Sequence, residues 1–170
     1  MPPAVTTQDA KDACWVLEYL IHDLIVAPQL YDLFCDIGKR ANVLPETEKA
    51  VRRMYISYLL LALDKFSEFY EKYGWLVPNT HKVRCRDIRK ELTRRKIRNL
   101  RNTFIGHILN NKTGRPILNS EIDAAFNAAT GNDVIAFLRW IHVPGNTIAP
   151  NTVVGALDAV HAELRKVHGL

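Results

Sequence analysis

Two side chains of one segment, the guanidinium of Arg101 and the imidazole of His107, could cleave RNA without a metal ion. A histidine with an ordinary pKa of about 6.5 takes or gives a proton at neutral pH. An arginine presents a planar fork of donors to a phosphate and to the charge that develops there in the transition state. The ribose 2′-hydroxyl would be the nucleophile, which would make the reaction specific for RNA. The sequence lacks the acidic clusters by which nucleases hold a metal, and we expect no metal and no cofactor.

Helical periodicity places both residues on the core-facing side of their helix, in one sector with Leu100, Phe104 and Ile108. A charged arginine is almost never fully buried without a partner. Arg101 must therefore lie beside a carboxylate, at an edge of the bundle, or at an interface that lines a site. Positions six apart differ by about 120° and ~9 Å along an ideal helix, so the two side chains would flank a groove without touching. Spacing alone favours the simpler interpretation, in which the arginine is paired and the histidine lies at the core edge.

The chain is basic, and one stretch carries the whole positive excess. Its net charge is +5 and its pI is about 9.2. Ten lysines and arginines against two acids give residues 81–101 a charge of +8, which leaves −3 for the rest. RNA or DNA is the natural partner for such a field, although a solvated helix face explains the charge run alone equally well. The further side chains that we expect to bind RNA are Arg94, Arg95, Arg98 and Lys112.

Helices must position these side chains, because apolar residues recur at helical spacing nearly throughout the chain and no convincing strand pattern occurs. The predicted fold is all-α, a bundle of four to six helices within a single domain spanning residues 1–170. Two of the helices are long, covering about 45–73 and 82–109. The second of these is the basic helix, and it carries Arg101 and His107.

Capping and breaking residues predict where the helices begin and end. Pro28 should end a first helix that begins near residue 7 and buries Trp15, and a short helix should follow over about 30–37. Pro45 is typical of a helix start, while Gly74 and Gly131 are typical of helix ends. The later helices should begin at Ser120, paired with Asp123 in a capping box, at Asn132 or Asp133, and at Pro150.

Composition excludes several classes of protein. Cys14, Cys35 and Cys85 are odd in number and widely spaced, which argues against a disulfide scaffold or a zinc site and favours buried thiols in a reducing cytoplasm. The longest apolar run, residues 58–63, is far shorter than the ~20 residues that span a bilayer. The first residues do not follow the pattern of a secretion signal. We therefore expect a cytoplasmic protein that does not enter a membrane.

The segment Arg101-Asn102-Thr103-Phe104-Ile105-Gly106-His107 resembles the signature of the HEPN superfamily (higher eukaryotes and prokaryotes nucleotide-binding domains). In that signature an arginine is followed by a histidine after four to six intervening residues. A polar residue often follows the arginine directly, and a small residue often precedes the histidine. The preceding long helix resembles the second helix of HEPN proteins of the abortive-infection type, through its residues Met54, Tyr55, Tyr58, Leu59, Leu63, Asp64 and Phe66.

The resemblance implies a homodimer in which two copies of the motif line one cleft. It implies a metal-independent endoribonuclease, acting as a toxin or in phage defence, with an antitoxin protein as a further partner. His107 would be the general acid or base, Arg101 would stabilise the phosphate, and Asn102 would position the substrate. The toxins that are neutralised by nucleotidyl transfer carry a tyrosine two residues after the histidine. Leu109 stands there in this chain, which argues against that route of inactivation.

Two other functions fit the same residues. The chain could be a non-catalytic module that binds RNA or nucleotides, or a structural dimer that acts through a partner protein. We expect no catalytic role for His142, His161 or His168, because they fall near predicted helix ends, where a cationic side chain suits the helix dipole.

Overall fold

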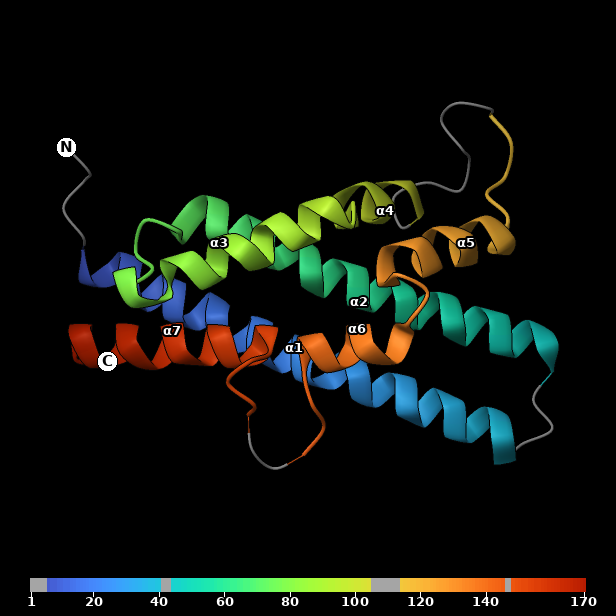
Figure 1. Cartoon of the computed structure of the whole chain (residues 1–170), viewed down its shortest axis with the longest axis horizontal. Coiled ribbons are helices and arrows are strands. Elements are labelled where there is room, and N and C mark those ends of the chain that lie inside the picture. Colours follow the sequence, from blue (N-terminus) through green and yellow to red (C-terminus); the bar gives the residue numbers. More distant parts are fainter. Residues whose placement is uncertain (1–5, 41–43, 105–113, 146–147) are drawn as a thin grey trace.

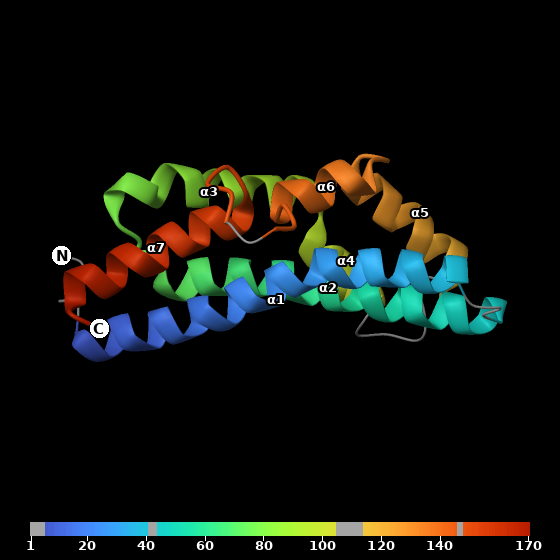
Figure 2. The same cartoon turned by 90° about the horizontal axis from the view of Figure 1, so that it is seen from below.

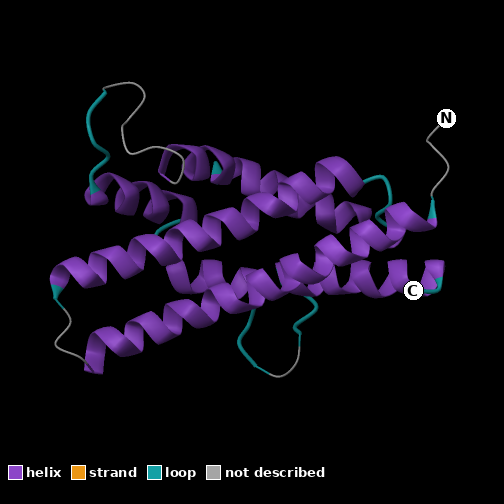
Figure 3. Cartoon of the chain, turned by 180° about the vertical axis from the view of Figure 1, so that it is seen from behind, coloured by secondary structure: helices purple, strands orange, loops and turns teal. Residues whose placement is uncertain are grey.

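The computed structural model of the chain describes residues 6–40, 44–104, 114–145 and 148–170. Helix accounts for most of this part of the chain, and the described loops are short (Figure 3). The all-α prediction is therefore confirmed, but the described residues form seven helices where four to six were expected. These are α1 (Thr7–Arg40), α2 (Pro45–Tyr73), α3 (Asn79–Arg94), α4 (Ile97–Phe104), α5 (Asn119–Thr130), α6 (Val134–Ile141) and α7 (Val153–His168).

The two longest helices, α1 and α2, run antiparallel along the length of the molecule (Figure 1). Viewed from below, they form one layer, and α3, α5, α6 and α7 lie over it (Figure 2). Helix α4 follows α3 and packs against α2, and it also contacts α5. The start of α1 and the end of α7 lie at the same end of the molecule (Figures 1 and 3).

One apolar core lies between the layers. Leu17 and Leu24 of α1, Leu63 and Phe66 of α2, and Leu157 of α7 are fully buried within it. Burying such a side chain contributes about 1.5–3 kcal/mol, so the long amphipathic faces hold the helices together more than helix propensity does. Ile97 of α4 is also buried, which attaches the helix that carries Arg101 to the core.

Several predicted boundaries are confirmed. Pro45 is the first residue of α2, and Gly74 ends that helix. Gly131 ends α5 in the left-handed conformation (φ 71°), which glycine adopts without a steric penalty. Asp133 caps α6 by accepting a hydrogen bond from the Ala136 amide at 2.8 Å.

Helix α1 does not end at Pro28, as the sequence predicted, but continues to Arg40. Proline removes one hydrogen bond and crowds the carbonyl four residues earlier, which normally ends or kinks a helix. Here Pro28 is buried, and Tyr31 in the following turn packs against Tyr55 of α2 with ring centroids 5.5 Å apart. Packing on α2 therefore stabilises α1 across the proline. Residues 30–37, which were expected to form a separate short helix, are part of α1.

The basic helix is interrupted, although the sequence predicted it to be continuous over about 82–109. α3 ends at Arg94, and Lys96 takes a left-handed conformation (φ 56°) before α4 begins. Its amide donates to the Thr93 carbonyl at 3.0 Å, which closes a tight final turn. Neither glycine nor proline marks this break, and a lysine with positive φ is uncommon.

The later helix starts are shifted. Helix α5 begins at Asn119, and Glu121 rather than Asp123 accepts a hydrogen bond from the Leu118 amide, at 2.9 Å. Helix α7 begins at Val153, with Thr152 rather than Pro150 at its start. Among the described residues, no helix combines the length and the apolar character that crossing a membrane requires.

Candidate functional site

The motif begins in the last turn of the short helix α4, where Arg101 and Asn102 lie. The carboxamide oxygen of Asn102 accepts a hydrogen bond from Nη1 of Arg101 at 2.9 Å, so these two side chains form one unit. His107 and Lys112 lie outside the described residues. The structure therefore places the arginine and the polar residue of the motif, and the predicted convergence of Arg101 and His107 stays a prediction.

A buried carboxylate holds Arg101 in place. Asp64 of α2 is only 2% exposed, and its Oδ2 lies 3.3 Å from Nε of Arg101. The other oxygen, Oδ1, accepts a hydrogen bond from Nε of Arg98 at 3.0 Å. Oδ2 has no donor in hydrogen-bond geometry among the described residues, so its contact with Arg101 is an ion pair. Asp64 thus joins α2 to α4 through two arginines one turn apart.

Two further carboxylates of α2 complete the site. Glu68 accepts from Nη2 of Arg101 at 3.2 Å, and Glu71 accepts from Nη1 of Arg98 at 3.1 Å. Hydrogen bonds from Arg98, and then its charge, lower the pKa of Glu71, while the hydrogen bonds from Glu71 and Asp64 raise the pKa of Arg98. Asp64, Glu68 and Glu71 will be called the acidic stripe, and together with Arg98 and Arg101 they will be called the arginine–carboxylate cluster.

The outer part of the cluster is open to solvent. The side chain of Arg101 is 34% exposed: its Nε faces the buried Asp64, and its Nη2 donates to Glu68, whose side chain is 55% exposed. Arg101 therefore satisfies two of the three environments that the sequence allowed, beside a carboxylate and at an edge of the bundle. Its described partners also agree with the simpler interpretation of a paired arginine.

The other predicted RNA-binding residues differ in their placement. Arg94 is exposed and forms a two-nitrogen contact with Glu91 one turn earlier, which helps to lower the pKa of Glu91 to about 2. The side chain of Arg95 is only 16% exposed, donates to the Ala129 carbonyl, and lies over the ring of Phe137 at 4.9 Å. Arg95 therefore connects the end of α3 to α5 and α6, and its predicted contact with RNA stays a prediction.

Carboxylates neutralise much of the charge that the sequence concentrates in residues 81–101. Among these cations, Arg89, Arg94, Arg95, Arg98 and Arg101 each have a carboxylate partner within 3.4 Å. Lys82, Arg86 and Lys96 have no ion pair within the described parts of the chain. The field that a polyanion would meet is consequently weaker than the sequence charge suggests.

A pocket of about 290 Å³ opens where α3 meets α4. Its walls include Ser67, Glu71, Arg89, Lys96, Arg98 and Asn99. Glu71 lies between Arg89, at 3.4 Å, and Arg98, and it occupies the position in which these guanidinium groups could hold an anion. The pocket adjoins the arginine–carboxylate cluster on its Glu71 side.

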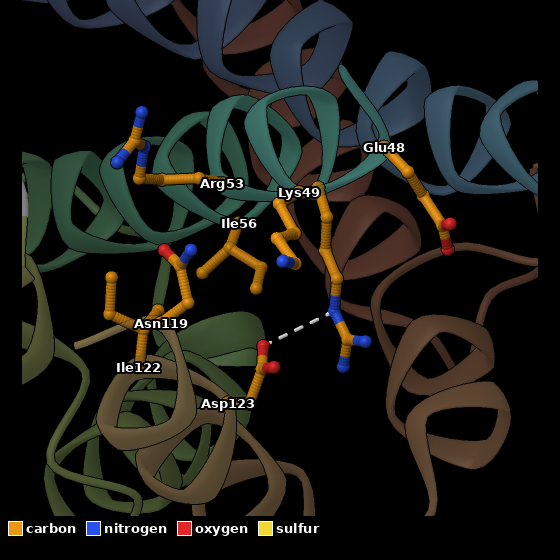
Figure 4. A pocket seen from close by; sticks show the side chains of 8 residues that line it. Glu48, Lys49, Arg53, Ile56, Asn119, Ile122 and Asp123 are labelled. Atoms are coloured by element: carbon orange, nitrogen blue, oxygen red, sulfur yellow. Dashed lines mark ion pairs between the residues drawn. The ribbon is translucent and has the colours of Figure 1, made fainter. Parts of the chain in front are cut away.

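A second pocket, of about 240 Å³, lies between the first half of α2 and the start of α5 (Figure 4). An ion pair of 3.3 Å between Arg52 and Asp123 crosses it, and the side chain of Glu48 points away from the other labelled residues. The mixture of acids and bases leaves little net charge to attract a ligand. We find nothing there that indicates chemistry.

Sequence reasoning missed the role of the acidic stripe. Asp64 entered only through the family resemblance, and Glu68 and Glu71 were not considered. The signal was present, because these acids follow one another at spacings of four and three and so share one side of the helix. Arg98 and Arg101 have the matching spacing of three. Within the described residues, no group of three or more His, Cys, Asp or Glu side chains is arranged to hold a metal ion.

No protein-family model matches the chain, and a search of the curated proteins found no match. Among solved structures, the chain is similar to the integron cassette protein Vpc_cass2 from the mobile metagenome of V. paracholerae. The two proteins share a fold. The TM-score is 0.76, and the match covers 95% of this chain and 99% of that chain at 20% sequence identity. At this identity the likeness concerns architecture and carries no information about activity.

Proposed function

We propose that this chain is a metal-independent endoribonuclease of HEPN type. The observation that carries the proposal is the position of Arg101, whose partly exposed guanidinium is held at the edge of the bundle by the buried carboxylate of Asp64. An arginine fixed in this way is preorganised to receive a phosphate. Asn102, bonded to the same guanidinium, would orient the bound strand.

The proposed reaction is the attack of a ribose 2′-oxygen on the adjacent phosphorus. A base removes the 2′-hydroxyl proton, the bond from phosphorus to the 5′-oxygen breaks, and an acid protonates that leaving oxygen. The products are a 2′,3′-cyclic phosphate and a 5′-hydroxyl. His107 would carry one of the two proton transfers, and Arg101 would stabilise the charge on the phosphate oxygens. In a homodimer, the two-fold axis would bring a second copy of the motif to the same cleft.

The ion pairs of Arg101 suggest how a phosphate would enter. Glu68 is 55% exposed on its side chain and can turn into solvent, whereas Asp64 is enclosed. A phosphate would therefore replace Glu68 at Nη2 and leave the contact of Asp64 with Nε in place. Asp64 would then act as a positioning residue and Glu68 as an exchangeable partner.

The biological setting that we propose follows the family resemblance. The protein would act in the cytoplasm as a toxin or in defence against phage, and a separate antitoxin protein would restrain it. Arg94, Arg98 and Lys112 would contribute to RNA binding outside the reacting phosphate.

The test is RNA degradation in the presence of EDTA. Wild type should cleave, while Arg101→Ala and His107→Ala should each lose roughly 10²–10⁴-fold in rate, the usual effect of removing a charge-stabilising or proton-transferring group. Arg165→Ala removes an exposed arginine of α7 that lies outside the cluster, and it should cleave like wild type. Equal cleavage by all of these proteins would show that the assigned site is wrong.

The pairing of both cluster arginines with carboxylates favours a second candidate, a module that binds RNA or nucleotides without turnover. Such a module needs cations near its surface to bind phosphates. It does not need an unpaired arginine to stabilise a reacting phosphate. Tight, salt-dependent binding of RNA that stays intact after long incubation would select it. Absence of any RNA or nucleotide affinity at low salt would leave a structural dimer acting through another protein.

A further inference from the structure

Two aromatic side chains stand on the outer face of α1, where the sequence analysis expected Trp15 to be buried. Trp15 is 62% exposed and Tyr19, one turn later, is 56% exposed. Their rings meet edge to face with centroids 4.8 Å apart. The neighbouring positions Leu17 and Leu20 fill the core, so the helix has its inward face complete without the tryptophan. Exposure of so much aromatic surface costs free energy unless a ligand or partner covers it.

The two rings form one wall of a groove of about 390 Å³ between α1 and α2, which we call the aromatic groove. Its volume lies within the range of small-molecule sites. Phe69 and Tyr73 of α2, both buried, line it opposite α1. Trp15 and Tyr19 therefore present ring faces and edges to a space that is apolar behind and open in front.

Lysines border the aromatic groove. Lys65 and Lys72 of α2 both line it, and Nζ of Lys72 lies 4.8 Å from the centroid of the Tyr73 ring. Lys65 also reaches Asp23 at 2.7 Å, which holds its ammonium group at the groove edge. Aromatic rings combined with cations are the elements that bind single-stranded nucleic acid, the rings stacking the bases and the cations contacting the phosphates. A purely hydrophobic protein partner would gain nothing from these lysines.

The aromatic groove is continuous with the arginine–carboxylate cluster. Glu68 lines the groove and also accepts a hydrogen bond from Arg101 at 3.2 Å. A ligand that displaces Glu68 from Arg101 is therefore already at the edge of the groove. A nucleotide whose phosphate bound Arg101 would have its base beside the groove that Trp15 and Tyr19 line.

We infer that the aromatic groove binds a nucleobase of single-stranded RNA next to the phosphate bound at Arg101, by stacking on Trp15, with the nearly perpendicular ring of Tyr19 at the edge of the base. The inference rests on the proposed function for the phosphate at Arg101, but not on turnover. The groove would read the presence of a base rather than its identity, because every base offers a stacking face.

The experiment measures binding with probes that cannot be cleaved. A fluorescein-labelled oligoadenylate with 2′-O-methyl riboses lacks the nucleophile, and a matched strand of abasic residues keeps the phosphates but offers no rings. Fluorescence anisotropy gives the affinity of each probe for wild type, Trp15→Ala, Trp15→Phe and Leu33→Ala. Leu33 is the matched control, because it is an exposed apolar residue of the same helix outside the groove. Trp15 contributes little to the core, and circular dichroism verifies that each variant is folded.

We expect wild type to bind the oligoadenylate more tightly than the abasic strand. Trp15→Ala should weaken oligoadenylate binding by about 5- to 150-fold, the range that the loss of one stacked base gives, and leave abasic binding unchanged. Trp15→Phe should retain most of the affinity, and Leu33→Ala should match wild type. This result supports the inference even if the protein cleaves no RNA.

Three results overturn the inference. Wild type could bind both probes equally, or Trp15→Ala could bind the oligoadenylate like wild type, even while Arg101→Ala abolishes cleavage. Trp15→Ala could instead change only the oligomeric state in sedimentation velocity, with RNA affinity unaffected, which would make the groove an interface between protein chains.

Discussion

Replacing Asp64 tests the central contact of the cluster. Asp64→Asn keeps the size of the side chain but removes the charge that both arginines share. The asparagine oxygen can still accept from Arg98, whereas its amide would present N–H groups to Nε of Arg101, which is itself a donor. We expect Asp64→Asn to release Arg101 more than Arg98.

The expected loss of stability follows from the burial of the three side chains. A hydrogen bond involving a charged group contributes about 1.5–3 kcal/mol, and removing one partner of a fully buried ion pair costs about 3–5 kcal/mol. Here only the carboxylate is enclosed, since Arg98 and Arg101 stay partly exposed and keep Glu71 and Glu68 as partners. We therefore expect a loss of about 2–3 kcal/mol, or roughly 4–12 °C in Tm for a chain of this size.

Urea unfolding followed by far-UV circular dichroism measures the change in the free energy of unfolding. A double-mutant cycle then shows how much of that change comes from the contact between Asp64 and Arg101. The coupling free energy between Asp64→Asn and Arg101→Gln should be about 1–2 kcal/mol, because the pair includes a buried carboxylate. The exposed pair of Glu46 and Lys49 on α2, 3.4 Å apart, is the control and should couple by less than about 0.5 kcal/mol. A coupling for Asp64 and Arg101 as small as that of the control would refute the idea that Asp64 holds the arginine.

The remaining predictions concern the core. Burial lowers the pKa of His142, whose ring nitrogens have no partner among the described residues. The unfolded chain therefore binds a proton at this histidine more readily than the folded chain does. The free energy of unfolding should keep its full contribution from neutral His142 above the ordinary pKa of about 6.5 and fall as the pH drops below that value. Urea midpoints between about pH 7 and pH 5 should show a flatter slope for His142→Leu, and identical slopes would contradict this. Tyr55→Phe should leave stability unchanged or raise it by about 1 kcal/mol, because its buried hydroxyl lacks a partner in the described chain, whereas Tyr58→Phe should cost about 1 kcal/mol through loss of the bond to Asp23; thermal unfolding of both variants distinguishes the two. Gly155→Ala should lower the free energy of unfolding by about 1–3 kcal/mol or more, since a Cβ there would overlap the Ala149 carbonyl oxygen. At Gly169 a Cβ would meet open space, so Gly169→Ala should cost only about 1–2 kcal/mol through backbone strain at φ 64°. A larger loss of stability for Gly169→Ala than for Gly155→Ala in the same assay would count against this packing argument.

The sequence predicted helix boundaries correctly where the capping or breaking residue itself determines the boundary. Pro45, Gly131 and Asp133 act through their own backbone or side chain within one turn; the sequence assigned Pro45 and Gly131 correctly and gave Asp133 as one of two candidates. Pro28 carries an equally strong local signal, yet α1 passes through it because contacts with α2 lie on both sides of it. Such contacts depend on residues more than twenty positions away, which a local pattern does not contain.

The break between α3 and α4 could not be predicted for a related reason. The run Thr93-Arg94-Arg95-Lys96 contains ordinary helix formers and no glycine or proline. The break is compensated elsewhere, by Arg95 reaching the end of α5 and by Ile97 entering the core. Trp15 was misassigned because helical spacing does not distinguish a core tryptophan from an exposed one at the border of the apolar face. In the candidate site, the sequence singled out Arg101 and Asn102, whose roles stay predictions, whereas the acids that position the arginine required three-dimensional contacts.

Under the proposed function, the guanidinium of Arg101 would link RNA affinity thermodynamically to the rigidity of the protein. The nitrogen Nη2 that would bind a phosphate now connects α4 to Glu68 of α2, so binding of an anion there would loosen one connection between α2 and α4. Linkage is reciprocal. A protein partner that stabilises the contact between α4 and α2 would therefore lower the affinity for RNA by the factor by which RNA lowers the affinity for that partner. An inhibitor of this protein would then need no access to the cleft, because clamping two helices together from outside would be enough.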